Sequence, residues 1–323
     1  MPASTTTERP HDLSVVIVST NEAQWLEACL RTVYAHAGGA DLDIVVVDNE
    51  SSDGTAAVVE EGFPRARVVR CANRGFAHAN NRALLTCESR YLLCLNPDTE
   101  IVAGTFGELV EMLDERPRLG LVGVKQLTGE GDLYPTVRRF PNAGRAFAEA
   151  FIPEGLAGRP LGIGERHLDL AAYDGEIECD WTTGAFMLIR REALLGAGLM
   201  DERLFLYGDE PDLCIRIKRA GWRIIHSPRM TIVHHAGKAG IKPKLVAQDV
   251  VARRVYAEKH FSSPHRYAYL GAVAARHATR ALLPRRMGGG PERRAASKRA
   301  LSTLLGRREP PFGPPPATSV DVT

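Results

Sequence analysis

Acidic side chains border several apolar stretches of this sequence. Asp48 ends one apolar run, Asp98 stands just beyond another, and Asp209 and Glu210 open a stretch with helical spacing. A carboxylate in such a position can ligate a divalent cation through oxygen or accept a proton from a hydroxyl group. Each acid alone is weak evidence, because turn formers and helix caps are often acidic too. Their order along one chain is more informative.

Asp98 is the clearest of these acids. The apolar run Tyr91–Leu95 predicts a short buried strand, which breaks at Pro97 and leaves Asp98 at its exposed carboxyl end. A parallel α/β sheet places its chemistry just beyond the carboxyl ends of its strands. Asp98 is therefore the first candidate for a metal-binding carboxylate.

The elements that would position these side chains alternate between strands and helices. Continuous apolar runs predict strands buried on both faces, and apolar residues at helical spacing predict the helices between them. This alternation indicates right-handed βαβ units and a parallel sheet. The expected strands are 13–19, 43–48, 67–70, 91–95, 119–126, 179–189, 222–226 and 230–234, and the expected helices lie around 25–33, 57–58, 76–85, 104–115, 191–197 and 209–220. From 129 to 178 the pattern dissolves, and a segment of that length without regular structure is usually functional or mobile.

The composition is that of an ordinary globular protein. The 323 residues are 44% hydrophobic and 25% charged, which allows one large domain or two small ones. The first twelve residues lack an apolar signal core, and no apolar run reaches the roughly 20 residues of a membrane span, so a cytoplasmic protein is expected. Six cysteines without CxxC or zinc-finger spacing predict buried thiols rather than disulfides.

The charge is unevenly distributed along the chain. From Ser262 onward there are 11 Lys or Arg and 3 Asp or Glu, a net +8, so the remainder carries −6 of the overall +2. A basic segment on an acidic body suggests an anionic partner such as a membrane or nucleic acid, and the weakly amphipathic stretch 267–283 could rest on lipid headgroups at the inner face of the cell membrane. Packing on the catalytic body, or a merely solvated tail, is the alternative.

Together these motifs resemble glycosyltransferase family 2, the inverting enzymes of the GT-A fold, and within it the rhamnosyltransferase-like branch. The resemblance covers about residues 13–237, and its motif order and spacing are specific for the family but not for the substrate. The matching segments are Val15–Val18, Val47–Gly54, Asn73–Ala77 with Asn80 and Asn81, Leu95–Thr99, Asp180–Ala185, Phe205–Cys214 and Val233–His235.

The resemblance implies a nucleotide pocket at the ends of the first two strands. Asp48 would hydrogen-bond the base or the ribose, and Thr20 stands where many relatives place a tyrosine on the base. Asn73, Gly75 and Asn80 match a loop that closes around the nucleotide, although Asn-Arg-Gly alone predicts only a turn. The implied donor-binding residues are Thr20, Glu22, Asp48, Asn49, Asp53, Asn73, Gly75, Asn80 and Asn96.

The segment Asn96-Pro97-Asp98 resembles the DXD-like element of the family, with Asn96 in place of the first acid. Asp98 is then the main carboxylate for Mn²⁺ or Mg²⁺, which would neutralise charge on the leaving nucleoside diphosphate. One carboxylate suffices only if phosphate oxygens complete the coordination shell. A histidine adds a ligand in the family, and His234 is the first choice over His235; a histidine that merely caps a strand is the alternative.

The resemblance assigns the catalytic base to the pair Asp209-Glu210. Inverting transfer is one in-line displacement that needs a carboxylate to take the proton of the acceptor hydroxyl. Relatives usually read Glu-Asp here, with the second acid as base, whereas this chain reads Asp-Glu. Position favours Glu210 and residue type favours Asp209; Glu210 is the first choice. Asp212 fits a first-turn acid favoured by the helix dipole.

The acceptor side is implied by Trp181, Thr183 and Gly184, where the Trp181 ring could stack on a sugar face. A core tryptophan at a sheet edge explains Trp181 equally well. In the irregular region, Arg138 and Arg139 could cover the donor or contact an acceptor pyrophosphate.

The sequence therefore predicts an α/β protein with the GT-A fold, a mostly parallel central sheet and a C-terminal helical extension. The expected organisation is a disordered tail (1–12), a catalytic domain (13–260), a basic helical extension (261–305) and a Pro-rich disordered tail (306–323). A dinucleotide-binding dehydrogenase is excluded, because no G-x-G-x-x-G follows the first strand.

The expected function is inverting, metal-dependent transfer of a sugar from a nucleotide-sugar donor to a hydroxyl group. The resemblance favours dTDP-L-rhamnose as donor and a cell-envelope glycan or polyprenyl-linked saccharide as acceptor. UDP-linked galactofuranose, glucose or N-acetylglucosamine are alternative donors, and a non-catalytic nucleotide-sugar or glycan-binding module is an alternative of another class. No nucleic-acid partner is expected.

Overall fold

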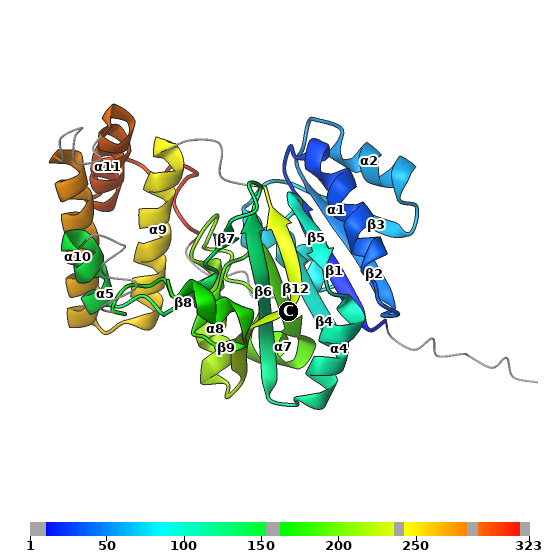
Figure 1. Ribbon diagram of the computed structural model, residues 1–323. Helices are drawn as coiled ribbons and strands as arrows, with labels where there is room; N and C mark the ends of the chain where they lie inside the picture. Colours follow the sequence, from blue (N-terminus) through cyan, green and yellow to red (C-terminus); the bar gives the residue numbers. More distant parts are fainter. Residues whose placement is uncertain (1–10, 153–161, 236–241, 283–289, 317–323) are drawn as a thin grey trace, which may run out of the picture.

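A mixed sheet of ten strands forms the centre of the larger part of the molecule (Figure 1). The computed structural model describes residues 11–152, 162–235, 242–282 and 290–316. Within these residues the strand order is β3-β2-β1-β4-β11-β6-β12-β5, with β7 beside β6 and β9 beside β12. The predicted α/β class with a mostly parallel sheet is confirmed.

The N-terminal half of the sheet is parallel and built from βαβ units. Val15 and Ile17 pack into the core beneath α1, whereas Val16 and Val18 pack into the core beneath α3, so both faces of β1 are buried. Ser19 pairs with Asp48, which brings the ends of two strands to one edge. The elements are β1 (Leu13–Ser19), α1 (Ala23–Ala35), β2 (Leu42–Asn49), α2 (Thr55–Gly62), β3 (Ala66–Cys71), α3 (Phe76–Leu84) and β4 (Tyr91–Leu95).

An antiparallel strand joins this half to the rest of the sheet. β11 runs antiparallel between β4 and β6, while β12 pairs with β6 in parallel and with β5 antiparallel. The elements of this half are β5 (Thr99–Ala103), α4 (Phe106–Glu115), β6 (Leu119–Thr128), β11 (Phe186–Arg190), α7 (Arg191–Ala197), α8 (Asp209–Arg219) and β12 (Arg223–His234).

Parts of the expected strand pattern are wrong. The stretch 179–189 is not one strand, because a turn at Gly184 and Ala185 separates β10 (Trp181–Thr182) from β11. The stretches 222–226 and 230–234 are one strand, β12, whose register shifts between Ser227 and Thr231 so that the residues between them bulge out. The edge strand β5 was not predicted.

Regular structure also exists where the sequence showed none, between residues 129 and 178. α5 has a clear start, because the Asn142 side chain accepts a hydrogen bond from the N–H of Arg145. The short lengths of the other elements explain why no periodicity is visible. They are β7 (Leu133–Tyr134), β8 (Val137–Arg138), α5 (Ala143–Phe151), a 3₁₀ helix (Leu170–Asp174) and β9 (Ile177–Glu178).

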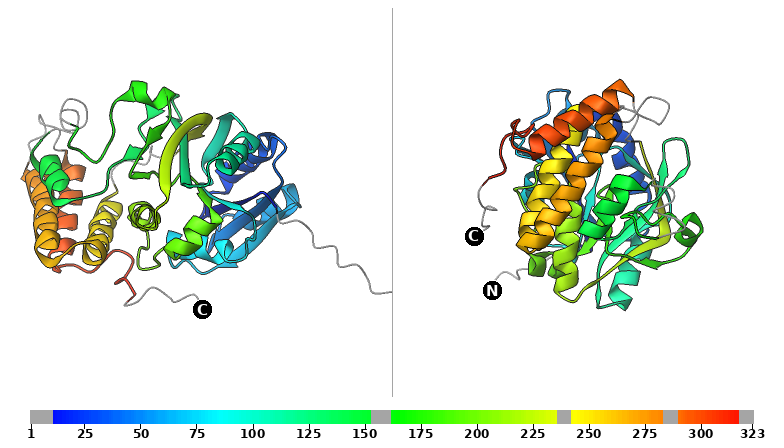
Figure 2. Two further views of the ribbon diagram at one scale, coloured as in Figure 1. Left: turned by 90° about the horizontal axis from the view of Figure 1, so that it is seen from below. Right: turned by 90° about the vertical axis from the view of Figure 1, so that its left-hand side faces the viewer.

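Three helices at one end of the molecule form a separate core with α5 (Figure 2). They are α9 (Pro243–His260), α10 (Ser263–Leu282) and α11 (Pro291–Leu304). Ala146, Val250, Tyr269, Val273 and Ala300 bring α5 and all three helices into that core. α9, which the expected boundary at residue 260 placed in the catalytic domain, therefore packs with the helical extension. Tyr269, Ala272 and Val273 of α10 face this core, whereas Tyr267 and Leu282 are exposed, so α10 packs on its neighbours by one face.

The Pro-rich residues 306–316 pack on the protein, although the sequence predicted disorder. The Phe312 ring stacks on Phe205, with the ring centres 4.3 Å apart. Proline loses little side-chain entropy on burial, so this stretch can pack on the protein despite its low hydrophobicity. Residues 1–10 of the expected N-terminal tail and the end of the Pro-rich stretch at 317–323 lie outside the described residues.

Two composition-based expectations can be compared with the structure. All six cysteines are free and all but Cys71 are buried, which confirms the predicted thiols. Among the described helices, none combines the length and the apolar character needed to span a bilayer.

Candidate active site

A cavity of about 620 Å³ opens where β1, β2 and β4 end, beside the start of α8. The carboxyl ends of parallel strands meet at such an edge, which is where ligands bind in open α/β sheets. Most of the residues predicted from the sequence line this cavity: Thr20, Glu22, Asn49, Asn73, Gly75, Asn96, Asp98, Thr183, Gly184, Asp209, Glu210 and His234.

Asp98 and His234 meet at one point of the cavity. The backbone N–H of His235 donates to the carbonyl of Asp98 at 2.9 Å, which fastens the end of β12 to the turn after β4. Nε2 of His234 lies 3.1 Å from Oδ1 of Asp98, and Nδ1 lies 2.9 Å from the side-chain nitrogen of Gln126. Gln126 thus fixes the orientation of the imidazole from behind.

Negative charge is concentrated around this pair. Burial, followed by the charge of Asp98, raises the pKa of Glu22 to about 7, against the opposing effect of His234. Such crowding favours a bound cation. Within the described residues no three His, Cys, Asp or Glu side chains form a metal-holding group, so a cation at Asp98 would need ligands from the substrate or water.

The two acids at the start of α8 are neighbours in the chain, with Asp209 buried and Glu210 partly buried. Oε1 of Glu210 accepts a hydrogen bond from the N–H of Gly184 at 3.1 Å, whereas Oδ2 of Asp209 is buried without a partner in the described structure. Burial raises the pKa of both carboxyls, and the charge of Glu210 raises that of Asp209 further. In Glu210, backbone N–H groups and Arg138 oppose the rise. Glu210 therefore holds the negative charge of the pair more readily.

Gly184 owes its residue type to this contact. A Cβ atom added at Gly184 would lie 2.9 Å from Oε1 of Glu210 and 3.2 Å from its Cγ. Only glycine lets the backbone between β10 and β11 approach the carboxylate this closely. Gly184, which was predicted to line the acceptor side, thus supports the candidate base.

The predicted nucleotide side is held in place by side-chain hydrogen bonds and by one close approach of two backbone segments. Nδ2 of Asn49 donates to Oγ1 of Thr20 at 3.1 Å, and Oδ1 of Asn73 accepts from the N–H of Gly75 at 3.3 Å. Gly75 has a φ of +109°, and an added Cβ would lie 2.6 Å from the backbone of Phe205. The loop is therefore pressed against the segment that leads into α8.

Three predicted donor-binding residues are not among the described residues that line the cavity. Oδ1 of Asp48 accepts from the N–H of Ser51 at 2.9 Å, and Oδ2 of Asp53 accepts from the N–H of Ala23 at 2.9 Å. Asn80 is buried and donates to a carbonyl of its own helix. These side chains stabilise the loops around the cavity.

A second cavity, of about 150 Å³, lies on the other side of Glu210. Thr183, Tyr207 and Glu210 line both cavities, so the candidate base stands between them. Trp181 borders only the second one, with its Nε1–H donating to the carbonyl of Arg139 at 3.0 Å and its ring partly buried against the core. The far wall comes from α9 and α10, so the helical extension contributes to the site.

The sequence analysis did not predict Gln126 or Phe312, which line the larger cavity. Gln126 stands near the end of an apolar strand, and that polar interruption was a usable signal. Arg138 was expected to meet the donor or acceptor, and it lies in the second cavity, 5% exposed, with Nη1 unpaired within the described structure. Phe312 had no such signal, because its place depends on the return of a distant segment.

The profile of the family described as "Glycosyl transferase family 2" matches residues 14–194. The chain belongs to this family and is a glycosyltransferase. Among solved structures, GalNAc-T7 with UDP, GalNAc and Mn²⁺ superposes with a TM-score of 0.59 at 15% identity, covering 93% of this chain and 56% of that one. A mannosyltransferase from Pyrobaculum calidifontis, in complex with GDP-Man and Mn²⁺, superposes with a TM-score of 0.51 at 19% identity, covering 94% and 82%. The fold is GT-A.

Curated relatives include two rhamnosyltransferases. N-acetylglucosaminyl-diphospho-decaprenol L-rhamnosyltransferase of Mycobacterium tuberculosis is 26% identical over 282 residues, which cover 82% of this chain and 91% of that protein. Rhamnosyltransferase WbbL of Escherichia coli is 22% identical over 231 residues, covering 69% and 83%. The predicted resemblance to the rhamnosyltransferase-like branch is confirmed at this level of similarity.

Proposed function

We propose that this protein is an inverting, metal-dependent glycosyltransferase that moves a sugar from a nucleotide-diphospho-sugar to an acceptor hydroxyl. The observation that carries the proposal is the arrangement of one cavity, which has Asp98 and His234 on one side and Glu210 on the other. A donor bound with its diphosphate at the first pair would present its sugar toward Glu210. An acceptor in the second cavity would approach the same carboxylate.

Asp98 and His234 are the proposed ligands of Mn²⁺ or Mg²⁺. A carboxylate and an imidazole fit a divalent cation whose other positions are filled by diphosphate oxygens and water. Such a cation, when bound, stabilises the negative charge of the leaving nucleoside diphosphate. The described residues supply two meeting ligands and the crowded charge around Glu22, and both GT-A structures compared above contain Mn²⁺.

Glu210 is the proposed base. The acceptor oxygen attacks the anomeric carbon while Glu210 takes its proton, and the bond to the diphosphate breaks with its electron pair leaving on the nucleotide. Gly184 fixes the carboxylate by its N–H, and Asp209 beside it gives up its proton less readily, because burial raises its pKa well above the ordinary value. Glu210 is thus preferred to Asp209 as the base because of its hydrogen-bond and charge partners, not because of the order of the two acids in the sequence.

The proposed donor is dTDP-L-rhamnose, and the proposed acceptor is a polyprenyl-diphosphate-linked saccharide or another cell-envelope glycan. Support comes from the names of the two rhamnosyltransferase relatives, one of which names a diphospho-decaprenol substrate. UDP-linked galactofuranose, glucose and N-acetylglucosamine are the competing donors.

The test is a thermal-shift screen of nucleotide sugars with Mn²⁺, followed by transfer assays with the donors that stabilise the protein. Selective stabilisation by dTDP-L-rhamnose and transfer to a lipid-linked acceptor are expected, since a ligand stabilises the state it binds. Donor binding without turnover on any acceptor, combined with no effect of Glu210→Ala, would instead favour a non-catalytic binding module.

Peripheral contact with an anionic membrane at the cytoplasmic face is a further part of this proposal. Its support is the basic stretch from residue 262, which brings the protein near a lipid-linked acceptor. Sedimentation with vesicles that contain anionic lipid should fall as salt rises. Equal sedimentation with neutral and anionic vesicles would contradict it.

A further inference from the structure

The segment 306–316 leaves the helical extension and returns to the donor cavity. α11 ends at Leu304, and Gly306, with a φ of +70°, turns the chain; the N–H groups of Gly306 and Arg307 close the helix end on the carbonyls of Thr303 and Ser302. The red segment in Figure 1 then runs from α11 past α9 toward the sheet. A helix terminus thus directs the chain at the catalytic body.

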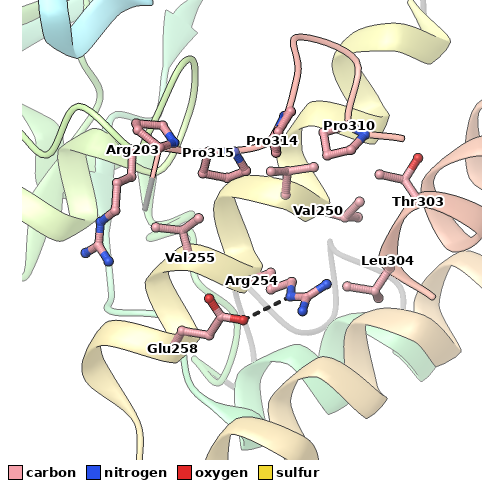
Figure 3. Close-up of a pocket in the computed structure, with 12 residues that line it drawn as sticks. Arg203, Val250, Arg254, Val255, Glu258, Thr303, Leu304, Pro310, Pro314 and Pro315 are labelled. Carbon is pink, nitrogen blue, oxygen red and sulfur yellow. Dashed lines mark hydrogen bonds and ion pairs between the residues drawn. The ribbon is translucent and has the colours of Figure 1, made fainter. Parts of the chain in front are cut away.

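Proline rings fix the course of this segment. Pro310, Pro314 and Pro315 line a pocket of about 390 Å³ together with apolar side chains of α9 and α11, as Figure 3 shows. The N–H of Gly313 donates to the carbonyl of Pro310 at 3.2 Å, which closes a tight turn. Few conformations are open to such a stretch, so a small contact area can hold it in one place.

The turn presents Phe312 to the donor cavity. Its ring stacks on Phe205 with centres 4.3 Å apart and planes 13° from parallel, and the ammonium of Lys244 lies 4.0 Å from its centre. The same ring lines the cavity that contains Asp98 and Glu210. The carbonyl of Phe205 accepts the N–H of Phe76 at 2.8 Å, so Phe312 stands beside the loop on the proposed nucleotide side.

We propose that Phe312 is a donor-positioning residue, which supplies an aromatic wall of the nucleotide-sugar site and keeps bulk water away from the bound sugar. The inference rests on the proposed function and extends it to a segment outside the family profile, which ends at residue 194.

Water exclusion matters because water competes with the acceptor for the same bond. In hydrolysis a water oxygen bonds to the anomeric carbon, the bond to the diphosphate breaks with its electrons on the nucleotide, and a carboxylate takes the water proton. An enzyme that must transfer rather than hydrolyse gains from a covered donor. Phe312 adds such cover from outside the sheet.

The experiment compares the full-length protein with Phe312→Ala, Phe312→Trp and Leu305→Ala. Leu305 is the matched control, since it immediately precedes this segment, is exposed, and is not among the residues that line the donor cavity. Phe312→Ala should weaken donor affinity about 2- to 10-fold, the range of one aromatic contact, and raise the ratio of donor hydrolysis to transfer. Phe312→Trp should restore both values, and Leu305→Ala should leave both unchanged.

Unchanged donor affinity and an unchanged hydrolysis ratio in Phe312→Ala would overturn the proposal. Faster transfer in Phe312→Ala would also overturn it, because the ring would then obstruct the site. If Phe312→Ala lowers the melting temperature, Phe312→Leu decides, since it keeps an apolar side chain in the turn but removes the aromatic ring. Weaker donor affinity in that variant supports the proposal, and unchanged affinity refutes it.

Failure of the proposed function is distinguishable from failure of this inference. Donor affinity is measured by thermal shift and needs no turnover. A wild-type protein that binds donor without turnover contradicts the proposed function, and Phe312 is then judged by affinity alone. A wild-type enzyme that turns over as expected, with Phe312→Ala equal to it, contradicts only the inference.

Discussion

The residue with the most consequence is Glu210, because it borders two cavities and has a fixed orientation. Its Oε1 atom is held by the N–H of Gly184, whereas Oδ2 of Asp209 has no partner within the described structure. A base must be positioned before it can be effective. In the proposed mechanism, the reversed order of the two acids in this chain therefore changes the length of the base rather than its place.

Glu210→Gln should lower kcat by about 100-fold or more while preserving donor affinity, because the amide cannot take the acceptor proton. Asp209→Asn should cost less. The measurement is steady-state transfer together with donor binding. If Asp209→Asn has the larger effect on kcat, the assignment of the base is reversed.

The same residue should set the acid limb of the pH profile. The pKa of Glu210 is raised from its ordinary value of 4.5, chiefly by burial, and only the ionised form acts as a base. Activity should therefore rise with pH through a value above 4.5, and this limb should vanish in Glu210→Gln. A limb at the ordinary value of a glutamate would show that the carboxyl is hydrated in the working enzyme.

Asp98→Ala should reduce Mn²⁺-dependent transfer by about 100-fold or more, since the proposed cation loses its only carboxylate ligand. His234→Ala should raise the Mn²⁺ concentration needed for half-maximal rate. Metal titrations of the three proteins provide the measurement. Full activity of Asp98→Ala at ordinary Mn²⁺ would remove Asp98 from the metal site.

At the scale of elements, the bend between β10 and β11 matters most. The sequence predicted one strand over this stretch, but the chain turns at Gly184 and then enters β11 beside β4. The turn brings a backbone N–H to the first turn of α8. A regular strand would have carried that N–H into a neighbouring ladder.

Gly184→Ala should lower transfer at least about tenfold with little loss of fold, because the new Cβ would displace the Glu210 carboxylate by several tenths of an ångström. Gly196→Ala is the matched control: it lies in α7, and nothing lies within 4 Å of an added Cβ. It should retain activity and gain slightly in stability, since alanine favours a helix. Equal activity of the two variants would refute the role of Gly184.

At the scale of the whole molecule, a buried charge network joins the catalytic body to the helical extension. Asp212 of α8 is fully buried, and its Oδ1 lies 2.7 Å from Nε2 of His260 in α9. Lys259 and Arg216 also donate to Asp212. The sequence suggested only a first-turn acid here, but Asp212 fastens the helix of the candidate base to α9.

Asp212→Ala should lower the free energy of unfolding by about 3–5 kcal/mol, because it removes the buried carboxylate on which His260, Lys259 and Arg216 converge. Glu27→Ala, which removes an exposed pair with Arg31, should cost no more than about 0.5 kcal/mol. Urea unfolding of the two variants is the measurement. Similar midpoints would show that the network is dispensable.

The pKa of Asp212 sets the direction in which the stability of the protein changes with pH. The partners of Asp212 lower its pKa below the ordinary 3.8 despite burial. Its contribution to stability is therefore complete above pH 3.8 and is lost as pH falls through the lower folded value. Wild type and Asp212→Ala should converge in stability only in that acid range.

The sequence by itself determined the parallel half of the fold and the place of the reactive edge. Apolar runs such as Leu13–Ser19 and Tyr91–Leu95 coincide with β1 and β4, and the start of α8 at Asp209 was also predicted. These features are local, because a buried strand or an amphipathic helix requires a pattern within its own few residues. Parallel pairing then brings their ends together.

Only the tertiary structure decided which side chains face the cavity. Asp48 and Asp53 are of the same residue type as Asp98, yet their carboxylates accept hydrogen bonds from nearby backbone N–H groups. Gln126 and Phe312, in contrast, enter the site from distant segments. A local pattern records whether a residue is apolar or where a helix begins, but not which remote residue will lie against it. That outcome depends on how the sheet, the bend at Gly184 and the helical extension pack together, which no stretch of the sequence contains alone.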